Sequence, residues 1–542
     1  MQSIVCLEHG KQNKKEWRNH RKKALPVKYL LALGFASAGL LLLLLCSTSI
    51  AADETIDVLT IGDPTGDWGF PSPYGHYSRG PGYVRMSMIF DTLVWKDQNG
   101  YVPALAESWQ LEDDAYVFNL RKNVSWHDGD PFTAKDVVFT INYIKEHPYQ
   151  WVNSEPVKGA EALDDYTVKL YLNKSYAPFM DMVAGTLPIL PEHIYRDVSN
   201  PEEFQDDIAL TGTGPYKLLD YDKAQGTYFY EAFDDYYLGA PKVKQLKFVK
   251  VSSEMSASAL ENGDVDAASV PPEMADSLKD KGFTVLKGSH DGITKIMVNH
   301  KNEPFSDARL RQALYYAIDR QALVDTALRG YGIIASPGLF ALDSEWCNPD
   351  VEPYKYDPAK TEEMMGALGY SKDGQYFSKD DEALEMEMLV TATNERAGEM
   401  IKQQLEQAGF KVTLRSVDSK TLDSLVGEWN FDLALNSHGG MGGDPEILNR
   451  IIGEGYFFNS ARYTADQKLN DLLDQEVSET DASKRKELVD EVQEVYAQDL
   501  PALPLYYSDS YWAHNGLVDA YYTKQGVANG IPIAINKQSF VR

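Results

Sequence analysis

The sequence is poor in cysteine. Three of its 542 residues are cysteines, and Cys347 is the only one that follows Cys46. No disulfide can therefore form within the chain beyond residue 46. A chain of this length folds without one when its hydrophobic core is large enough.

The sequence also lacks the motifs of common catalytic sites. It has no Gly-x-x-x-x-Gly-Lys-Ser/Thr phosphate loop, no His-Glu-x-x-His, no Cys-x-x-Cys and no Gly-x-Ser-x-Gly. The ten histidines are scattered, and only His438 lies on a glycine loop after a strand. The many carboxylates leave open a paired acid-base site, so an exported hydrolase is an alternative. We expect binding instead, with no catalytic residue, no metal site and no cofactor.

Positive charge is scarce. The formal net charge is −29, and residues 1–28 alone carry eight Lys or Arg against two Glu, so removing this +6 leaves −35 on the remainder. Such a surface repels nucleic acid and anionic membranes and keeps a protein soluble. Hydrophobic content of 43% and charged content of 25% are ordinary for a globular chain. The length predicts two or three domains.

One long apolar run occurs, at residues 29–46, after the basic segment and before a small-residue stretch that ends in Ala51 and Ala52. This pattern predicts a secretory signal peptide, and an uncleaved N-terminal anchor is the alternative. Cys46 suggests lipidation, but Leu45 stands before it where a small residue is expected. In each case the rest of the chain lies outside the cytoplasm, in the periplasm or at the outer cell surface.

Residues 431–450 are the most informative stretch. Apolar residues alternate over 431–435 as in a half-buried strand, and a glycine-rich loop follows. Asp444 and Pro445 then predict a helix start, as cap and first helical residue. Backbone N–H groups and a helix N-terminus would meet there, which favours a ligand site. A tight turn that needs positive φ is the alternative.

Other segments predict a mixture of strands and helices. A first strand at 56–62 leads into an aromatic and glycine-rich loop at 67–83, where ligand contacts or a cover for the core are equally plausible. Further expected elements are a helix at 84–95, hairpin turns at 98–100 and 127–129, a helix capped by Thr133, a strand at 294–299, a helix capped by Ser306, strands at 385–390 and 411–417, and helices at 464–477 and 483–498.

Several stretches together resemble one family. They include PALAESWQLEDDAYVFNLRKNVSWHDGDPFTAKDVVFTI (103–141), LPEHIY, TGTGPYKLLDY, LENGDVDA, EPFSDARLRQALYYAIDRQALVDTALRGYG and LPALPLYY. Their order resembles that of the family 5 extracellular solute-binding proteins of ABC importers, the peptide- and nickel-binding group. The resemblance implies that His127 and Asp128 are turn residues and not catalysts.

The resemblance implies an α/β (mixed α+β) fold of two lobes, of the periplasmic-binding-protein type II, cluster C. Lobe one would comprise 53–296, with a strand-rich domain inserted at about 93–205, and would be completed by 505–542. Lobe two would comprise 297–504, and 1–52 would be the signal peptide or anchor. The implied partners are a peptide or small-molecule ligand and an ABC permease with ATPase subunits. The protein would be a monomer, touching the membrane only through its N-terminus or the permease.

The resemblance also implies where ligand binds, in loops 74–85 and 436–444. The candidate ligand-binding residues are Tyr77, Arg79, Tyr83, Arg85, His438, Gly439, Gly440, Met441 and Asp444.

The ligand class stays open. Peptide binders of the family hold the peptide amino group with an acid where this chain has Met441, which cannot pair with an ammonium. Nickel-chelate binders use an arginine near 187–190, where none is present. An oligopeptide or similar small solute is the leading hypothesis. A metal chelate or another anionic solute held by Arg79, Arg85 and His438 is the alternative, and a ligandless chaperone or receptor would share the fold.

Overall fold

The computed structural model describes residues 55–372, 374–453 and 467–541. The predicted signal peptide or anchor lies outside the described residues, as does the start of the helix expected at 464–477. Within the described ranges, no helix has both the length and the apolar character needed to cross a bilayer.

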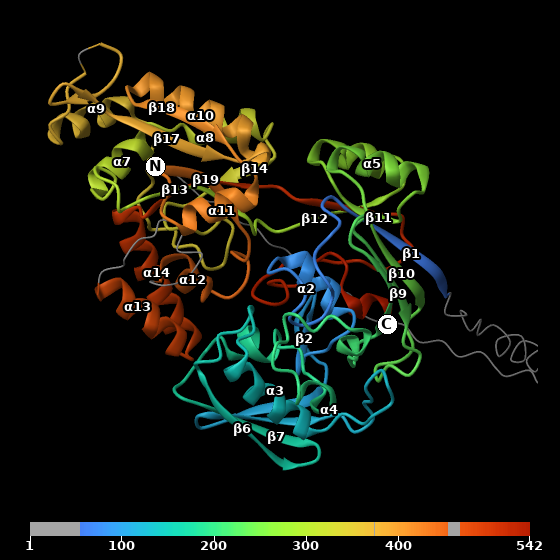
Figure 1. Cartoon of the computed structure of the whole chain (residues 1–542). Helices are drawn as coiled ribbons and strands as arrows, with labels where there is room; N and C mark the ends of the chain where they lie inside the picture. Colours follow the sequence, from blue (N-terminus) through green and yellow to red (C-terminus); the bar gives the residue numbers. More distant parts are fainter. Residues whose placement is uncertain (1–54, 373, 454–466, 542) are drawn as a thin grey trace, which may run out of the picture. The chain divides into compact units, whose positions relative to one another are not determined.

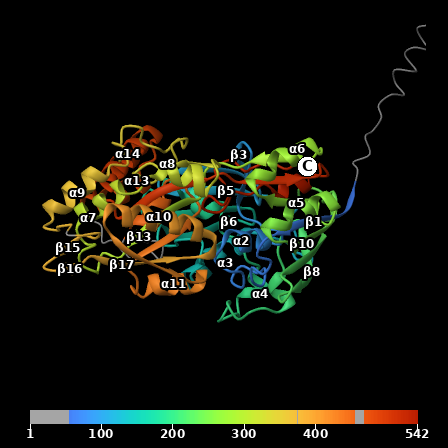
Figure 2. The same ribbon diagram turned by 90° about the horizontal axis from the view of Figure 1, so that it is seen from above.

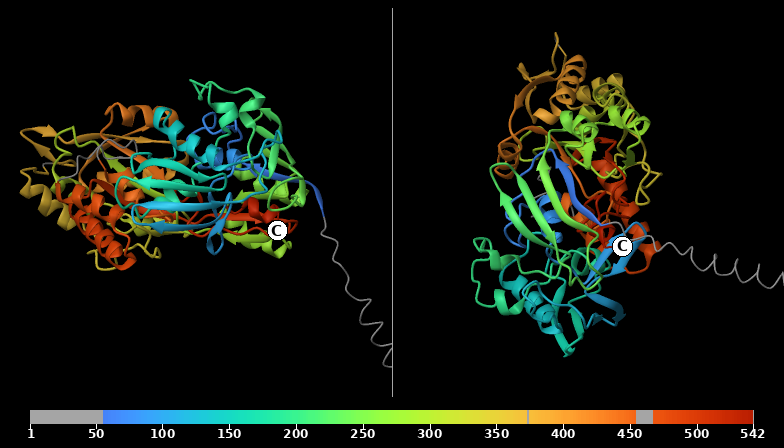
Figure 3. Two further views of the ribbon diagram at one scale, coloured as in Figure 1. Left: turned by 90° about the horizontal axis from the view of Figure 1, so that it is seen from below. Right: turned by 90° about the vertical axis from the view of Figure 1, so that its right-hand side faces the viewer.

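A seven-stranded mixed sheet forms one part of the fold. The first strand, β1, lies between β10 and β11 and runs parallel to both. In the right-hand view of Figure 3, the blue strand β1 lies beside green strands of this sheet. In sheet order they are β12 (Thr284–Lys287), β21 (Tyr511–His514), β11 (Ala267–Val270), β1 (Ile56–Asp63), β10 (Val243–Lys250), β9 (Thr227–Ala232) and β8 (Tyr216–Asp222).

A six-stranded mixed sheet forms a second part (Figure 1). Strand β19 lies inside it, antiparallel to β13 and parallel to β17. In sheet order the strands are β14 (Gly332–Ile334), β20 (Ala502–Ser508), β13 (Ile293–Val298), β19 (Leu433–His438), β17 (Glu385–Val390) and β18 (Lys411–Ser416).

An antiparallel four-stranded sheet is added between the first strand and β8 along the chain. Its order is β4 (Ala106–Glu112), β5 (Ala115–Leu120), β7 (Thr167–Leu172) and β6 (Val157–Asp164). The hairpin of β2 (Val94–Asp97) and β3 (Gly100–Pro103) precedes it, and a two-stranded piece, β15 (Ser378–Lys379) with β16 (Glu382–Ala383), lies elsewhere.

Helices connect and cover these sheets. The described α-helices are α2 (Gly80–Ser87), α3 (Ala134–Glu146), α4 (Glu192–Tyr195), α5 (Ser253–Asn262), α6 (Ala275–Asp280), α7 (Ala308–Tyr316), α8 (Arg320–Ala322), α9 (Pro358–Ala367), α10 (Glu395–Ala408), α11 (Ser419–Gly427), α12 (Ile447–Ile452), α13 (Gln467–Ser478) and α14 (Ala482–Asp499).

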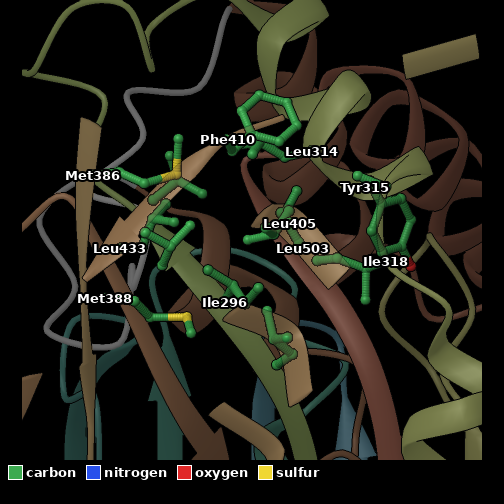
Figure 4. Close-up of a cluster of buried hydrophobic side chains, with 14 of the residues drawn as sticks. Ile296, Leu314, Tyr315, Ile318, Met386, Met388, Leu405, Phe410, Leu433 and Leu503 are labelled. Atoms are coloured by element: carbon green, nitrogen blue, oxygen red, sulfur yellow. The ribbon is translucent and has the colours of Figure 1, made fainter. Parts of the chain in front are cut away.

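The six-stranded sheet is buried on both faces because its strands alternate between two hydrophobic clusters. Ile296 and Leu433 pack with Leu405 of α10 on one face (Figure 4). Met297 and Ala434 pack against α11 on the other face. In Figure 2, β13 and β17 accordingly lie between α10 and α11. Such two-sided burial is typical of strands covered by helices on both faces.

The chain passes between the two large sheets twice. It leaves β12 and enters β13 through residues 288–292, and it returns from β20 to β21 through residues 509–510. The lobe boundaries expected at 296/297 and 504/505 fall inside β13 and β20, which lie in the six-stranded sheet along their whole length. The sheets therefore place the two passages a few residues away from those boundaries.

Several expected elements are confirmed. Thr133 caps α3, and Asp136 completes a capping box with it. The turn at 98–100 joins β2 to β3, with Gly100 at a φ of 121°. The turn at 127–129 is present, and His127 hydrogen-bonds through Nε2 to the Gly214 carbonyl at 2.9 Å, which is a structural contact.

Three local expectations are wrong. The segment expected as a helix at 84–95 is helical only to Ser87, and its end forms β2, because those residues pair with β3. Asp307, not Ser306, caps α7 by accepting the N–H of Arg309. The strand after 431 is not half-buried at its start, since Leu433, Ala434 and Leu435 are all buried inside the sheet.

Candidate functional site

A cavity of about 530 Å³ lies where the ends of β1 and β19 approach each other. The residues after β1, the start of α2, the glycine loop after β19 and the C-terminal segment all line it. Most of the wall is apolar, with Trp151, Phe248, Trp512 and the run Ile531 to Ile535 among its residues. This volume is within the usual range for small-molecule sites.

Asp63 and Arg85 form a buried ion pair in the wall. The Arg85 guanidinium donates to Asp63 Oδ2 at 2.8 Å, and Asp63 Oδ1 also accepts the N–H groups of Thr65 and Gly66. The guanidinium stacks on Phe248, 3.6 Å from the ring centroid. Both charges are therefore compensated by the protein itself.

The glycine loop after β19 is anchored by Asp291, which comes from the first passage between the sheets. Asp291 Oδ2 accepts the N–H of Gly440 and Oδ1 accepts the N–H of Gly442, each at 3.1 Å. The Asp291 carbonyl accepts the N–H of Met441 at 3.1 Å. The backbone N–H groups expected to cradle a ligand thus hold a carboxylate of the same chain. Burial raises the pKa of Asp291 to about 6.

The same loop packs closely on the C-terminal segment. A Cβ on Gly443 would lie 2.8 Å from the Gly530 Cα, and a Cβ on Gly530 would lie 2.9 Å from the Gly440 carbonyl oxygen. Gly440 and Gly530 also have positive φ values of 89° and 86°. These glycines are therefore required for two backbones to approach each other.

A second ion pair connects the cavity wall to α11. Arg79, which precedes α2, donates to Asp423 of α11 at 2.6 Å. The Arg79 side chain is 51% exposed and the Asp423 side chain 27% exposed. This pair ties the loop beside the seven-stranded sheet to a helix that covers the six-stranded sheet.

His438 ends β19 and is neutral. Burial lowers its pKa well below the ordinary value, and the nearby positive charges of Lys295 and Arg79 lower it further. Burial likewise lowers the pKa of Lys295 to about 7. His438 therefore contributes an uncharged imidazole to the cavity wall.

The structure brings five of the nine candidate ligand-binding residues to the cavity. These are Arg79, Arg85, His438, Gly439 and Gly440. The other four are placed differently, and as ligand contacts all nine stay predictions.

Tyr77 donates its hydroxyl to Asp67 at 3.0 Å, and Tyr83 is fully buried with its hydroxyl on the Thr186 carbonyl. The Met441 side chain lies in a hydrophobic cluster. Asp444 accepts two hydrogen bonds from Arg485, at 2.8 and 2.6 Å. It also accepts the N–H of Glu446 at 2.9 Å, and α12 begins only at Ile447, later than expected.

The C-terminal segment and Trp151 also line the cavity, which the sequence did not predict. The run IPIAI at 531–535 is apolar without strand or helix periodicity, and that is the only signal it gives. Trp151 follows α3 in the added domain. Among the described residues no group of three or more His, Cys, Asp or Glu could hold a metal ion.

Residues 100–455 match the model of the bacterial extracellular solute-binding proteins, family 5, middle region. The chain belongs to this family. The family comprises non-catalytic binding proteins of ABC importers, so the hydrolase alternative is wrong.

Three similar proteins illustrate its range. The heme-binding protein A of Haemophilus influenzae is 27% identical over 458 residues, which are 78% of this chain and 82% of that protein. AppA of Bacillus subtilis, solved with a nonapeptide, has a TM-score of 0.76 at 22% identity over 90% of this chain and 99% of its own. NikZ of Campylobacter jejuni, solved with Ni(L-His), has a TM-score of 0.75 at 24% identity over 88% and 98%. The fold is therefore the two-lobed mixed α/β fold of these proteins, with an extra antiparallel sheet.

Proposed function

We propose that this family member captures an oligopeptide or a small solute of similar size in the cavity and delivers it to a membrane permease driven by ATPase subunits. The observation that carries the proposal is the cavity itself, which is lined from β1, α2 and the C-terminal segment on one side and from β19 and α12 on the other. The apolar wall would hold side chains of the solute, and the polar groups at the strand ends would orient it.

Two short passages between the sheets support a capture cycle by hinge closure. Only residues 288–292 and 509–510 carry the chain between the two large sheets within the described ranges. Rotation at such short segments can open the cavity to solvent and close it over a solute. Delivery then requires the permease to recognise the closed form.

A metal chelate or an anionic solute has less support. It would rely on Arg79, Arg85 and His438, but both arginines are already paired with carboxylates and His438 is neutral. An added anion would have to compete with these carboxylates.

The test is native mass spectrometry of the purified protein, together with small-angle X-ray scattering before and after addition of a peptide mixture. We expect an intact solute bound at one equivalent and a smaller radius of gyration when ligand is present. Absence of any bound solute, with no change in scattering, would contradict capture.

A further inference from the structure

The charges that line the cavity are paired with one exception. Arg85 is paired with Asp63, Arg79 with Asp423, and Arg450 with Glu446 at 3.0 Å. Asp291 is the remaining charged residue of the wall, and no ion pair connects it to any Lys, Arg or His in the part of the chain that the structure describes. The unbalanced charge of the wall is therefore negative.

Because Asp291 is buried, its unpaired negative charge destabilises the protein when no ligand is bound. The residue is buried, with a relative exposure of 8%, and within the described part of the chain its side chain accepts hydrogen bonds from the N–H groups of Gly440 and Gly442 alone. Each oxygen accepts one of them, which leaves a further lone pair on each. A buried carboxylate without a cation is stabilised strongly by any positive charge brought to it.

We propose that Asp291 is the residue that binds an ammonium group of the solute, so that the cavity selects an apolar solute with a free amino group. The inference rests on the proposed function and names the chemical class of its ligand. The apolar run at 531–535, together with Trp512 and Phe248, receives the body of the solute, and the amino group lies on Asp291 beside the glycine loop. An ammonium, with three donors, suits a carboxylate better than a metal ion does here, because two or three further ligands for a metal are not gathered among the described residues.

The wall offers few other places for an ammonium. Asp63 already accepts hydrogen bonds from two backbone groups, from Trp68 and from Arg85. Met441, whose side chain is directed into a hydrophobic cluster, presents no acceptor. Asp291 comes from a segment far earlier in the chain, 149 residues before Gly440 and 151 residues before Gly442.

The experiment compares matched probes by isothermal titration on the whole protein after ligand removal. Trileucine and N-acetyl-trileucine differ only in the amino group, and octylamine and octanoate repeat the comparison without a peptide backbone. We expect trileucine to bind about ten- to a hundredfold more tightly than its N-acetyl form, the effect of a charged hydrogen bond. Octylamine binding in preference to octanoate would identify a simple amine, and trileucine binding alone would identify a peptide.

Two variants distinguish direct contact between Asp291 and the solute from support of the glycine loop by Asp291. In Asp291→Asn we expect the preference for trileucine over N-acetyl-trileucine to disappear, whatever loss of affinity the two probes share through the loop that Asp291 also holds. A variant that keeps the tenfold or greater preference would mean that Asp291 only holds the loop, and would overturn the proposal. Asp423→Asn is the matched control, since it removes the carboxylate that pairs with Arg79 of the cavity wall, and it should affect both probes equally.

The outcomes also distinguish a failure of the proposed ligand class from a failure of the proposed capture function. Equal affinity for trileucine and N-acetyl-trileucine in the unmodified protein, or recovery of a solute without an amino group by native mass spectrometry, would overturn the ammonium site and leave solute capture standing. If no probe binds and no solute is recovered, solute capture itself fails.

Discussion

The protonation of Asp291 affects the stability of the folded chain. The Asp291 carboxylate holds two loop N–H groups, yet burial makes the charged form unfavourable and raises its pKa to about 6 from the ordinary 3.8. The folded chain holds this proton more tightly than the unfolded chain, so protonation of Asp291 stabilises the fold. This stabilisation is complete below the unfolded pKa and is lost as pH rises through about 6.

Asp291→Asn removes this contribution. The free energy of unfolding of the variant should therefore fall furthest below that of the parent at acidic pH and approach a constant difference above about pH 7, with a slope of at most about 1.4 kcal/mol per pH unit. Urea unfolding of both proteins without ligand, over about pH 4.5 to 7.5, measures the difference. A difference that widens toward alkaline pH would contradict the assignment.

Gly443 allows the loop and the C-terminal segment to pack on each other. Gly443→Ala places a Cβ 2.8 Å from the Gly530 Cα, where neither backbone can yield without moving the loop. We expect a loss of about 1–3 kcal/mol in stability and weaker solute binding, since overpacking displaces a cavity wall. Urea unfolding and titration with trileucine measure the two effects.

Gly366→Ala is the control for that substitution. Gly366 lies in α9, and a Cβ there would meet no atom within 4 Å. Alanine should be neutral or stabilising by up to about 1 kcal/mol, because it favours the helix. An equal loss of stability in both variants would show that the contact with Gly530 is unimportant.

At the scale of elements, hydrogen bonds and ion pairs connect the two passages between the sheets. His290 of the first passage lies between Asp343 and Asp509, with each ring nitrogen 2.8 Å from a carboxylate oxygen. Lys287 also pairs with Asp509 of the second passage at 2.8 Å. The His290 and Asp509 side chains are each 8% exposed, whereas those of Asp343 and Lys287 are 60% and 49% exposed. The contact between His290 and Asp509 is therefore the part of the network that is shielded from solvent.

His290→Gln breaks this network, because glutamine cannot reach both carboxylates in the geometry of a ring. We expect a loss of about 1–3 kcal/mol in stability and faster amide hydrogen exchange in residues 288–292 and 509–510. Hydrogen-exchange mass spectrometry locates the effect. His193→Gln, at an exposed pair with Asp128, should change stability by less than about 0.5 kcal/mol and leave the passages unchanged.

Elements with strong local signals were predictable from the sequence. The helix capped by Thr133 and α14 carry caps and regular apolar spacing, and both formed as expected. The segment at 84–95 is mostly apolar, and its composition could not show that its end pairs with β3. Pairing partners of this kind are set by tertiary contacts.

The cavity was predictable only in part for the same reason. The loops after β1 and β19 were identified because glycine and aromatic residues follow a strand, and both line the cavity. Asp291 and the run at 531–535 carry no motif, and they reach the site through contacts between segments far apart in the sequence. A sequence pattern cannot report such contacts without the fold.

At the scale of the whole described chain, contacts on several sides of the cavity hold the lobes together. The glycine loop packs on the segment around Gly530, and Arg79 pairs with Asp423. On the added domain, Ala177 donates its N–H to the carbonyl of Val477 in α13 at 2.7 Å. The lobes are therefore joined by separate contacts, which suits the proposed cycle of opening and closing.

The Arg79–Asp423 pair allows this balance to be measured. Because Arg79 is half exposed, the pair should contribute about 0–1 kcal/mol to closure, mostly through a slower release of ligand. Arg79→Ala and Asp423→Ala should each raise the trileucine dissociation rate by less than about fivefold, and the double variant should be no worse than either single one. The charge exchange Arg79→Asp with Asp423→Arg should restore part of the loss, and about 0.5 M salt should abolish the differences. Stopped-flow release from the parent, the two single variants, the double variant and the charge exchange measures the coupling. Strictly additive effects that do not depend on salt would mean that the pair does not hold the cavity closed.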